Sequence, residues 1–84
     1  MQQHITAIAD SFKVGESEAN CLLTMLVSES TSKDGWFETS RFDQQTITNL
    51  SREGGPLEFS TTRSFVKLTD GAKTRLNEIL SRFM

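Results

Sequence analysis

The sequence predicts an α+β domain that is mostly helical, on three observations. Apolar residues recur at three- and four-residue spacing in two N-terminal segments and one C-terminal segment, which is the pattern of amphipathic helices. Two short extended-type segments around a small polar tip predict a β-hairpin between 57 and 68. The 84 residues (1–84) suit a single domain, one that buries only about 60–65% of its unfolded surface.

The first helix is expected over 2–13, and Val14-Gly15 then predicts a left-handed stop. Ser17 is a suitable N-cap for a second helix that ends near Ser28. The stripe of the first helix is Ile5, Ile8, Ala9 and Phe12. The stripe of the second is Ala19, Leu22, Leu23, Leu26 and Val27, and it should form the centre of the core.

Residues 30–35, STSKDG, form a loop by composition. The next residues, Trp36-Phe37, leave two interpretations open: a short strand over 36–38, or the start of a short helix capped by Thr39 or Ser40. The strand is favoured. Both aromatic side chains are expected to anchor the core or the sheet, because so small a domain needs them for burial.

A third helix is expected over 44–53, with Asp43 as its N-cap and Gly54-Gly55-Pro56 as its stop. Segments 57–60 and 64–68 then form the hairpin. Its tip is Thr61-Thr62-Arg63. Thr69 predicts the cap of a last helix, over 70–84, whose stripe is Ala72, Leu76, Ile79, Leu80 and Phe83.

Composition excludes several classes of function. The single Cys21 and single His4 give no disulfide framework, metal site or catalytic pair, so no enzyme activity, metal or cofactor is expected. No segment has the length of a membrane span, and no signal peptide is visible, which predicts a cytoplasmic protein. The formal net charge is −2, yet residues 59–84 carry five basic side chains against two acidic ones. A local basic surface is therefore expected in the C-terminal third.

Two motifs in the second half resemble the winged-helix DNA-binding superfamily, and most closely the small bacterial regulators of the MarR and ArsR kind. One is a helix that closes on Leu50-Ser51-Arg52-Glu53-Gly54; the other is Val66-Lys67-Leu68-Thr69-Asp70-Gly71-Ala72 ahead of Leu76. The resemblance covers residues 43–84 and implies a winged helix-turn-helix of three to four helices with a C-terminal hairpin as its wing. The segment 30–42 departs from the family pattern, which places a clear helix there.

This resemblance gives the 44–53 helix a role in the major groove of duplex DNA. Its side away from Ile47 and Leu50 carries Gln45, Thr48, Asn49 and Arg52. Amide and guanidinium groups suit hydrogen bonding to base edges, whereas ordinary solvated faces favour Glu and Lys. A plain solvated face and a protein-binding face remain the two alternatives.

The hairpin is expected to contact phosphates or the minor groove. Four of its residues combine two positive charges with small hydrogen-bonding groups: Thr62, Arg63, Ser64 and Lys67. The alternative is an ordinary exposed turn in which Lys67 protects an edge strand.

The terminal segments 2–12 and 72–84 carry more apolar surface than so small a body needs, which predicts a homodimer built on the 2–13 and 70–84 helices. The sequence therefore favours a dimeric, sequence-specific duplex-DNA-binding transcriptional regulator. The competing hypothesis is a winged-helix protein-interaction module, such as an antirepressor, adaptor or accessory subunit. Net acidity and the departure in residues 30–42 favour that alternative.

Overall fold

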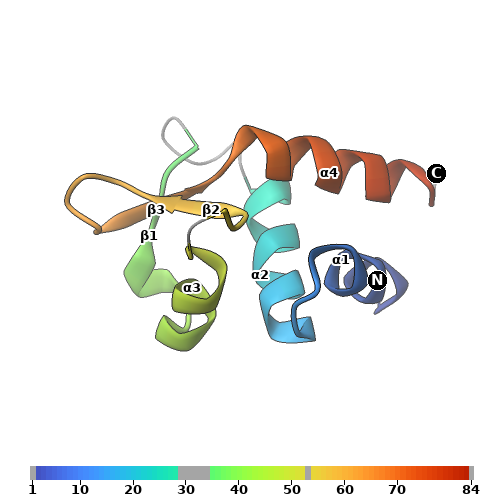
Figure 1. Cartoon of the computed structure of the whole chain (residues 1–84), viewed down its shortest axis with the longest axis horizontal. Helices are drawn as coiled ribbons and strands as arrows, with labels where there is room; N and C mark the ends of the chain where they lie inside the picture. The colour runs from blue at the N-terminus through green and yellow to red at the C-terminus, as the bar shows by residue number, and fades with distance from the viewer. Residues whose placement is uncertain (1, 29–34, 53, 84) are drawn as a thin grey trace.

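The computed structural model describes residues 2–28, 35–52 and 54–83, and in that part the chain is α+β and mostly helical, as predicted (Figure 1). The elements follow in the order α1 (Gln2–Phe12), α2 (Glu16–Val27), β1 (Phe37–Glu38), the 3-10 helix η2 (Thr39–Arg41), α3 (Gln44–Leu50), β2 (Leu57–Phe59), β3 (Phe65–Leu68) and α4 (Asp70–Ser81). The predicted loop at 30–35 lies, apart from Gly35, outside the described residues.

The strands form one antiparallel sheet in the order β1-β3-β2. The predicted hairpin is confirmed as β2 and β3, with Leu57 opposite Leu68. The predicted strand near 36–38 is confirmed as β1, which pairs Phe37 with Val66. Because side chains alternate across a strand, these four apolar side chains all point to the buried face.

Helix α2 lies at the centre of the molecule, where it contacts α1, α3, α4 and β3 (Figure 1). The largest fully buried side chains come from every layer around it: Ile8, Leu22, Met25, Ile47, Leu50, Val66 and Leu76. One apolar cluster therefore holds the helices and the sheet together, and α3 is positioned by its contact with α2.

The buried side of α2 agrees with the predicted stripe at Ala19, Leu22 and Leu23 and differs from it elsewhere. Cys21 and Met25 are buried, whereas Val27 is 68% exposed and Leu26 only half-buried. The centre of a small fold surrounds this helix with neighbours on several sides, so a single stripe does not describe it. The N-cap also differs: Gly15, rather than Ser17, precedes the helix, and its carbonyl accepts from the Ala19 amide at 3.0 Å.

Helix α1 ends earlier than Val14-Gly15 predicts. The left-handed residue is Lys13, with φ of 57°, and the Val14 amide donates to the Ala9 carbonyl at 3.0 Å. This six-to-one bond closes the helix and requires a positive φ at the residue before Val14. Gly15 instead has an extended backbone.

Helix α3 is shorter than the predicted 44–53. Asp43 caps it as predicted, since its carboxylate accepts from the Thr46 amide at 3.1 Å. The helix ends at Leu50 because the chain then turns sharply: Gly54 has φ of 79°, and the Gly55 amide donates to the Arg52 carbonyl at 2.8 Å. A Cβ at Gly55 would lie 2.5 Å from the Leu50 carbonyl oxygen, so this return needs glycine.

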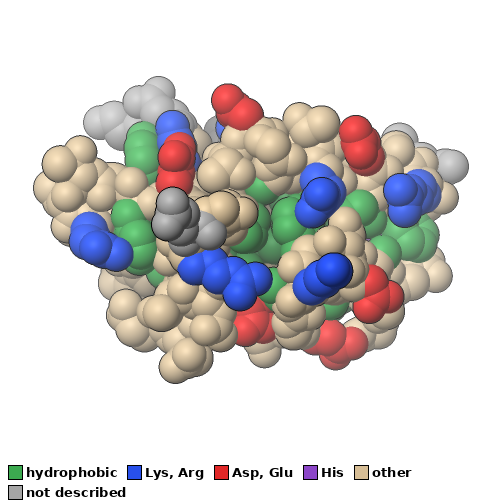
Figure 2. Space-filling view, in the orientation of Figure 1, with side chains coloured by type: hydrophobic (Ala, Val, Ile, Leu, Met, Phe, Trp, Pro, Cys, Tyr) green, Lys and Arg blue, Asp and Glu red, His purple; other side chains and the backbone are tan. Residues whose placement is uncertain are grey.

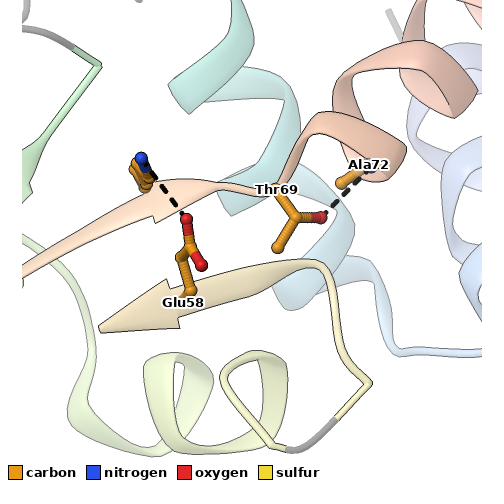
Figure 3. A network of polar contacts seen from close by, with 4 residues as sticks. Glu58, Thr69 and Ala72 are labelled. Carbon is orange, nitrogen blue, oxygen red and sulfur yellow. Dashed lines mark hydrogen bonds and ion pairs between the residues drawn. The ribbon is translucent and has the colours of Figure 1, made fainter. Parts of the chain in front are cut away.

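The predicted cap of α4 is confirmed, because Thr69 Oγ1 accepts from the Ala72 amide at 3.2 Å (Figure 3). The α4 stripe lies largely inside the chain: Leu76 and Ile79 are buried, and α4 packs on α1 and α2. The ring of Phe83 lies 4.5 Å from that of His4. The apolar side chains of the two terminal helices, from which a homodimer was predicted, thus pack mostly within one chain. The homodimer stays a prediction.

Candidate nucleic-acid interface

Helix α3 turns its apolar side inward and its polar side outward. Ile47 and Leu50 are fully buried, whereas Gln45, Thr48 and Asn49 are exposed. The predicted division of this helix into two sides is confirmed, with Thr46 as a further buried side chain beside its capping Asp43.

Two of the three exposed side chains are hydrogen-bonded within the chain. Gln45 Nε2 donates to Asn49 Oδ1 at 3.2 Å, and Asn49 Nδ2 donates to Glu18 Oε1 of α2 at 2.9 Å. These two hydrogen bonds hold the side-chain amides of Gln45 and Asn49 in one orientation. Because the groups that form them are solvent-accessible, exchanging one such bond for another costs little net free energy.

Arg52 does not lie on the helix as predicted. It follows the C-cap residue Ser51 and belongs to the turn that returns toward Gly55. Its side chain nevertheless lines a shallow hollow of about 390 Å³ together with Thr48, Asn49 and Glu18. Lys13 and Val14 complete this hollow, which we call the α3 hollow.

At the hairpin tip, the Arg63 amide donates to the Ser60 carbonyl at 3.0 Å, which closes the turn. Arg63 has φ of 64°, and its guanidinium lies 4.6 Å from the centre of the Phe59 ring. Thr62 Oγ1 lies 3.2 Å from Ser60 Oγ and accepts from the Ser64 amide at 3.4 Å. All three predicted tip residues are exposed, and the turn presents a cation beside two small polar groups.

Lys67 is engaged on the outer side of the sheet. Its Nζ lies 3.4 Å from Glu58 Oε1 (Figure 3). The same Nζ lies 4.7 Å from the centre of the Trp36 ring. The side chains of Trp36, Glu58 and Lys67 line a groove of about 580 Å³ together with Phe65 and Thr62. We call it the outer-sheet groove. Lys67 is therefore partly neutralised, which makes it the weakest of the predicted DNA contacts.

Five of the eight predicted site residues fall into two groups, and Gln45, Arg63 and Ser64 line neither hollow. Thr48, Asn49 and Arg52 share the α3 hollow, whereas Thr62 and Lys67 share the outer-sheet groove. Sequence reasoning missed Glu18, which is 31 positions from its partner Asn49 and shows no local signal of that contact. Acidic groups therefore lie among the cations at both places.

The thiol of Cys21 is held in its neutral form. Burial, and to a lesser extent the charge of Glu18, raises its pKa from 9.0 to about 11. Within the described ranges no group of three or more His, Cys, Asp or Glu side chains could hold a metal ion. No helix among those residues has the length and apolar character to cross a membrane.

Slow modification of Cys21 is the first testable prediction. At pH 8 only about one folded chain in a thousand carries the thiolate, so we expect an aromatic disulfide reagent to react slowly and urea to accelerate it. Raising the pH from 9 toward 11 should destabilise the fold, because the unfolded thiol ionises first. Rapid labelling of the folded protein at pH 8 would contradict the buried position.

Comparison of the chain with protein-family models, with curated proteins and with solved structures finds no match. The winged-helix resemblance accordingly stays a prediction that the geometry of the chain itself must support.

Proposed function

We propose that the chain is a winged-helix transcriptional regulator that binds duplex DNA, with α3 in the major groove and the β2–β3 hairpin beside it. One observation carries the proposal: α3 is fixed to the core by Ile47 and Leu50 while its amide side and the neighbouring Arg52 face solvent. A helix such as α3 is about 10–12 Å across with its side chains, which fits a major groove about 12 Å wide.

The arrangement around α3 supports the proposal. The hairpin follows α3 in the chain and leads through the Thr69 cap into α4, so its base is anchored on both sides. Ahead of α3, the single 3-10 turn η2 occupies the place where the resembling families have a helix. The support for α3 comes instead from α2, with which it shares the core.

A protein-interaction module is the second candidate, and a specific observation favours it. The outer-sheet groove exposes aromatic surface, with Phe65 at 41% exposure beside Trp36 and Phe59. Acidic groups also lie beside cations, as Glu58 does beside Lys67 and Glu18 does beside Arg52. Exposed aromatic rings are enriched in surfaces that bind proteins, and acids placed among the cations weaken the attraction for a polyanion such as DNA.

A salt series distinguishes the DNA-binding function from the protein-interaction function. It also compares the contributions of Arg63 and Lys67 to DNA binding. We expect the association constant for mixed genomic duplexes, measured by fluorescence anisotropy, to fall steeply with salt concentration. Arg63→Gly, which suits the positive φ at that position, should reduce the logarithmic salt slope by about 0.9. Lys67→Ala should reduce it less, because Glu58 already neutralises part of the charge of that ammonium.

A flat anisotropy trace at high protein concentration would end the DNA proposal and leave the interaction module. Equal loss of slope in Arg63→Gly and Lys67→Ala would contradict the ranking of the two cations. Thermal unfolding of each variant controls for damage to the hairpin.

A further inference from the structure

Two non-glycine residues in the described part of the chain have a positive φ, and both are long cations. Lys13 has φ of 57° and Arg63 has φ of 64°. Side chains of L-residues crowd the following carbonyl in this region, so glycine or asparagine is the ordinary occupant. Arg63 already belongs to the proposed DNA contact. Lys13 has no role in the function proposed so far.

The fold needs the left-handed backbone at position 13 but does not need a lysine there. The bond from the Val14 amide to the Ala9 carbonyl fixes the geometry of the turn, and the side chain of Lys13 is exposed. The ammonium makes no ion pair and no ring contact with a described residue. The positive φ of Lys13 therefore costs conformational free energy, and its ammonium makes no described ion pair or ring contact that would offset this cost.

Lys13 lies beside the proposed recognition surface. It lines the α3 hollow together with Thr48, Asn49 and Arg52, so the turn between α1 and α2 adjoins α3. The hollow holds two cations and one acid, Glu18, whose carboxylate accepts from Asn49. Figure 2 shows Lys and Arg side chains in a broken row across this face, with most acidic side chains toward its upper and lower edges.

The two left-handed cations come from segments on opposite sides of α3. In Figure 1 the hairpin tip lies to one side of this helix and the turn between α1 and α2 to the other. A helix in the major groove is flanked by the two phosphate backbones of the duplex, and cations on its flanks fix its register without reading sequence. Each turn is therefore placed to meet one of the two backbones.

We infer that Lys13 is a DNA-positioning residue that binds a backbone phosphate on the strand across the groove from the one contacted by Arg63. This inference rests on the proposed function and extends its surface to the turn between α1 and α2. The ligand group is a phosphodiester of duplex DNA. Arg52, in the same hollow, is left to contact base edges.

Three substitutions of Lys13 test the inference, because their expected effects on the melting temperature and on DNA binding differ. Lys13→Gly removes the charge and relieves the backbone, so its melting temperature should equal or exceed that of the wild type. Its salt slope for a mixed-sequence duplex should fall by about 0.9. Lys13→Gln should lower the salt slope by the same amount without raising the melting temperature. Lys13→Arg should keep the salt slope of the wild type.

Arg82→Gln is the matched control, because it removes one exposed charge beyond the end of α4, far from the hairpin. Its slope should remain that of the wild type. If the wild type binds and Lys13→Gly and Lys13→Gln keep its slope, the inference is overturned while the proposed function stands. An equal loss in Arg82→Gln would also overturn it. No salt-dependent binding by the wild type would end both.

Discussion

Replacing Leu76 by alanine should destabilise the fold by about 2–5 kcal/mol, the usual cost of truncating a fully buried leucine. Leu76 is 0% exposed and lies at the middle of α4, where that helix packs on α1 and α2. The truncation leaves a cavity that the packed side chains of α1 and α2 can fill only in part. Urea denaturation followed by circular dichroism measures the loss. A domain of this size has little stability in reserve, so the variant should be partly unfolded at 37 °C.

Leu80→Ala is the matched control, because it is the same change on the same helix at a half-buried position. The loss there should be on the order of 1 kcal/mol, since less apolar area returns to water. The comparison also tests the role of α4. If the two substitutions cost the same, or if the Leu80→Ala loss depends on protein concentration, the outer side of α4 is covered by a second chain, as the predicted homodimer requires.

Local signals predicted much of the fold. Asp43 and Thr69 are small oxygen-bearing residues ahead of helical segments, and both cap as expected. Ile47 and Leu50 lie one turn apart, so their shared burial follows from helix geometry alone. The hairpin followed from two extended segments with a polar tip between them. Each of these features is decided by residues close together in the chain.

Features that depend on distant neighbours were mispredicted or missed. Val27 continues the α2 stripe by spacing, yet it is 68% exposed, so the described part of the chain leaves most of its side chain uncovered. The end of α3 at Leu50 depends on a close backbone approach by Gly55 rather than on helix propensity. The left-handed Lys13 was mispredicted for a local reason, because the nearby Gly15 offered the more obvious stop.

The candidate site shows the same division. The polar side of α3 was predictable, because its spacing from Ile47 and Leu50 is fixed. The partners of the predicted site residues were not, since Asn49 contacts Glu18 from another helix and Lys67 contacts Trp36, which precedes β1. These contacts change the contribution that each residue is expected to make to the proposed DNA binding. The expected contribution of Lys67 falls, and that of Arg52 rises because it has no competing ion pair among the described residues.

Replacing Arg52 by alanine should therefore relax sequence preference more than any other single change to the surface. A bidentate contact of a guanidinium with guanine contributes about 1–3 kcal/mol of discrimination, equivalent to about 5- to 150-fold in the ratio of affinities. The fold should be nearly unaffected, because the side chain is exposed and the turn is closed by backbone groups. Selection from a random duplex library with the wild type supplies the preferred duplex, and a scrambled duplex of equal composition supplies the reference.

The pattern of loss across the two duplexes identifies the role of Arg52. Weaker binding to the preferred duplex alone is the expected result, and Arg82→Ala should change neither affinity. An equal loss on both duplexes would make Arg52 a phosphate contact and shift base reading to Gln45, Thr48 and Asn49. Unchanged affinity for both would remove Arg52 from the interface. Because Arg52 shares the α3 hollow with Thr48 and Asn49, that outcome would also place DNA away from α3.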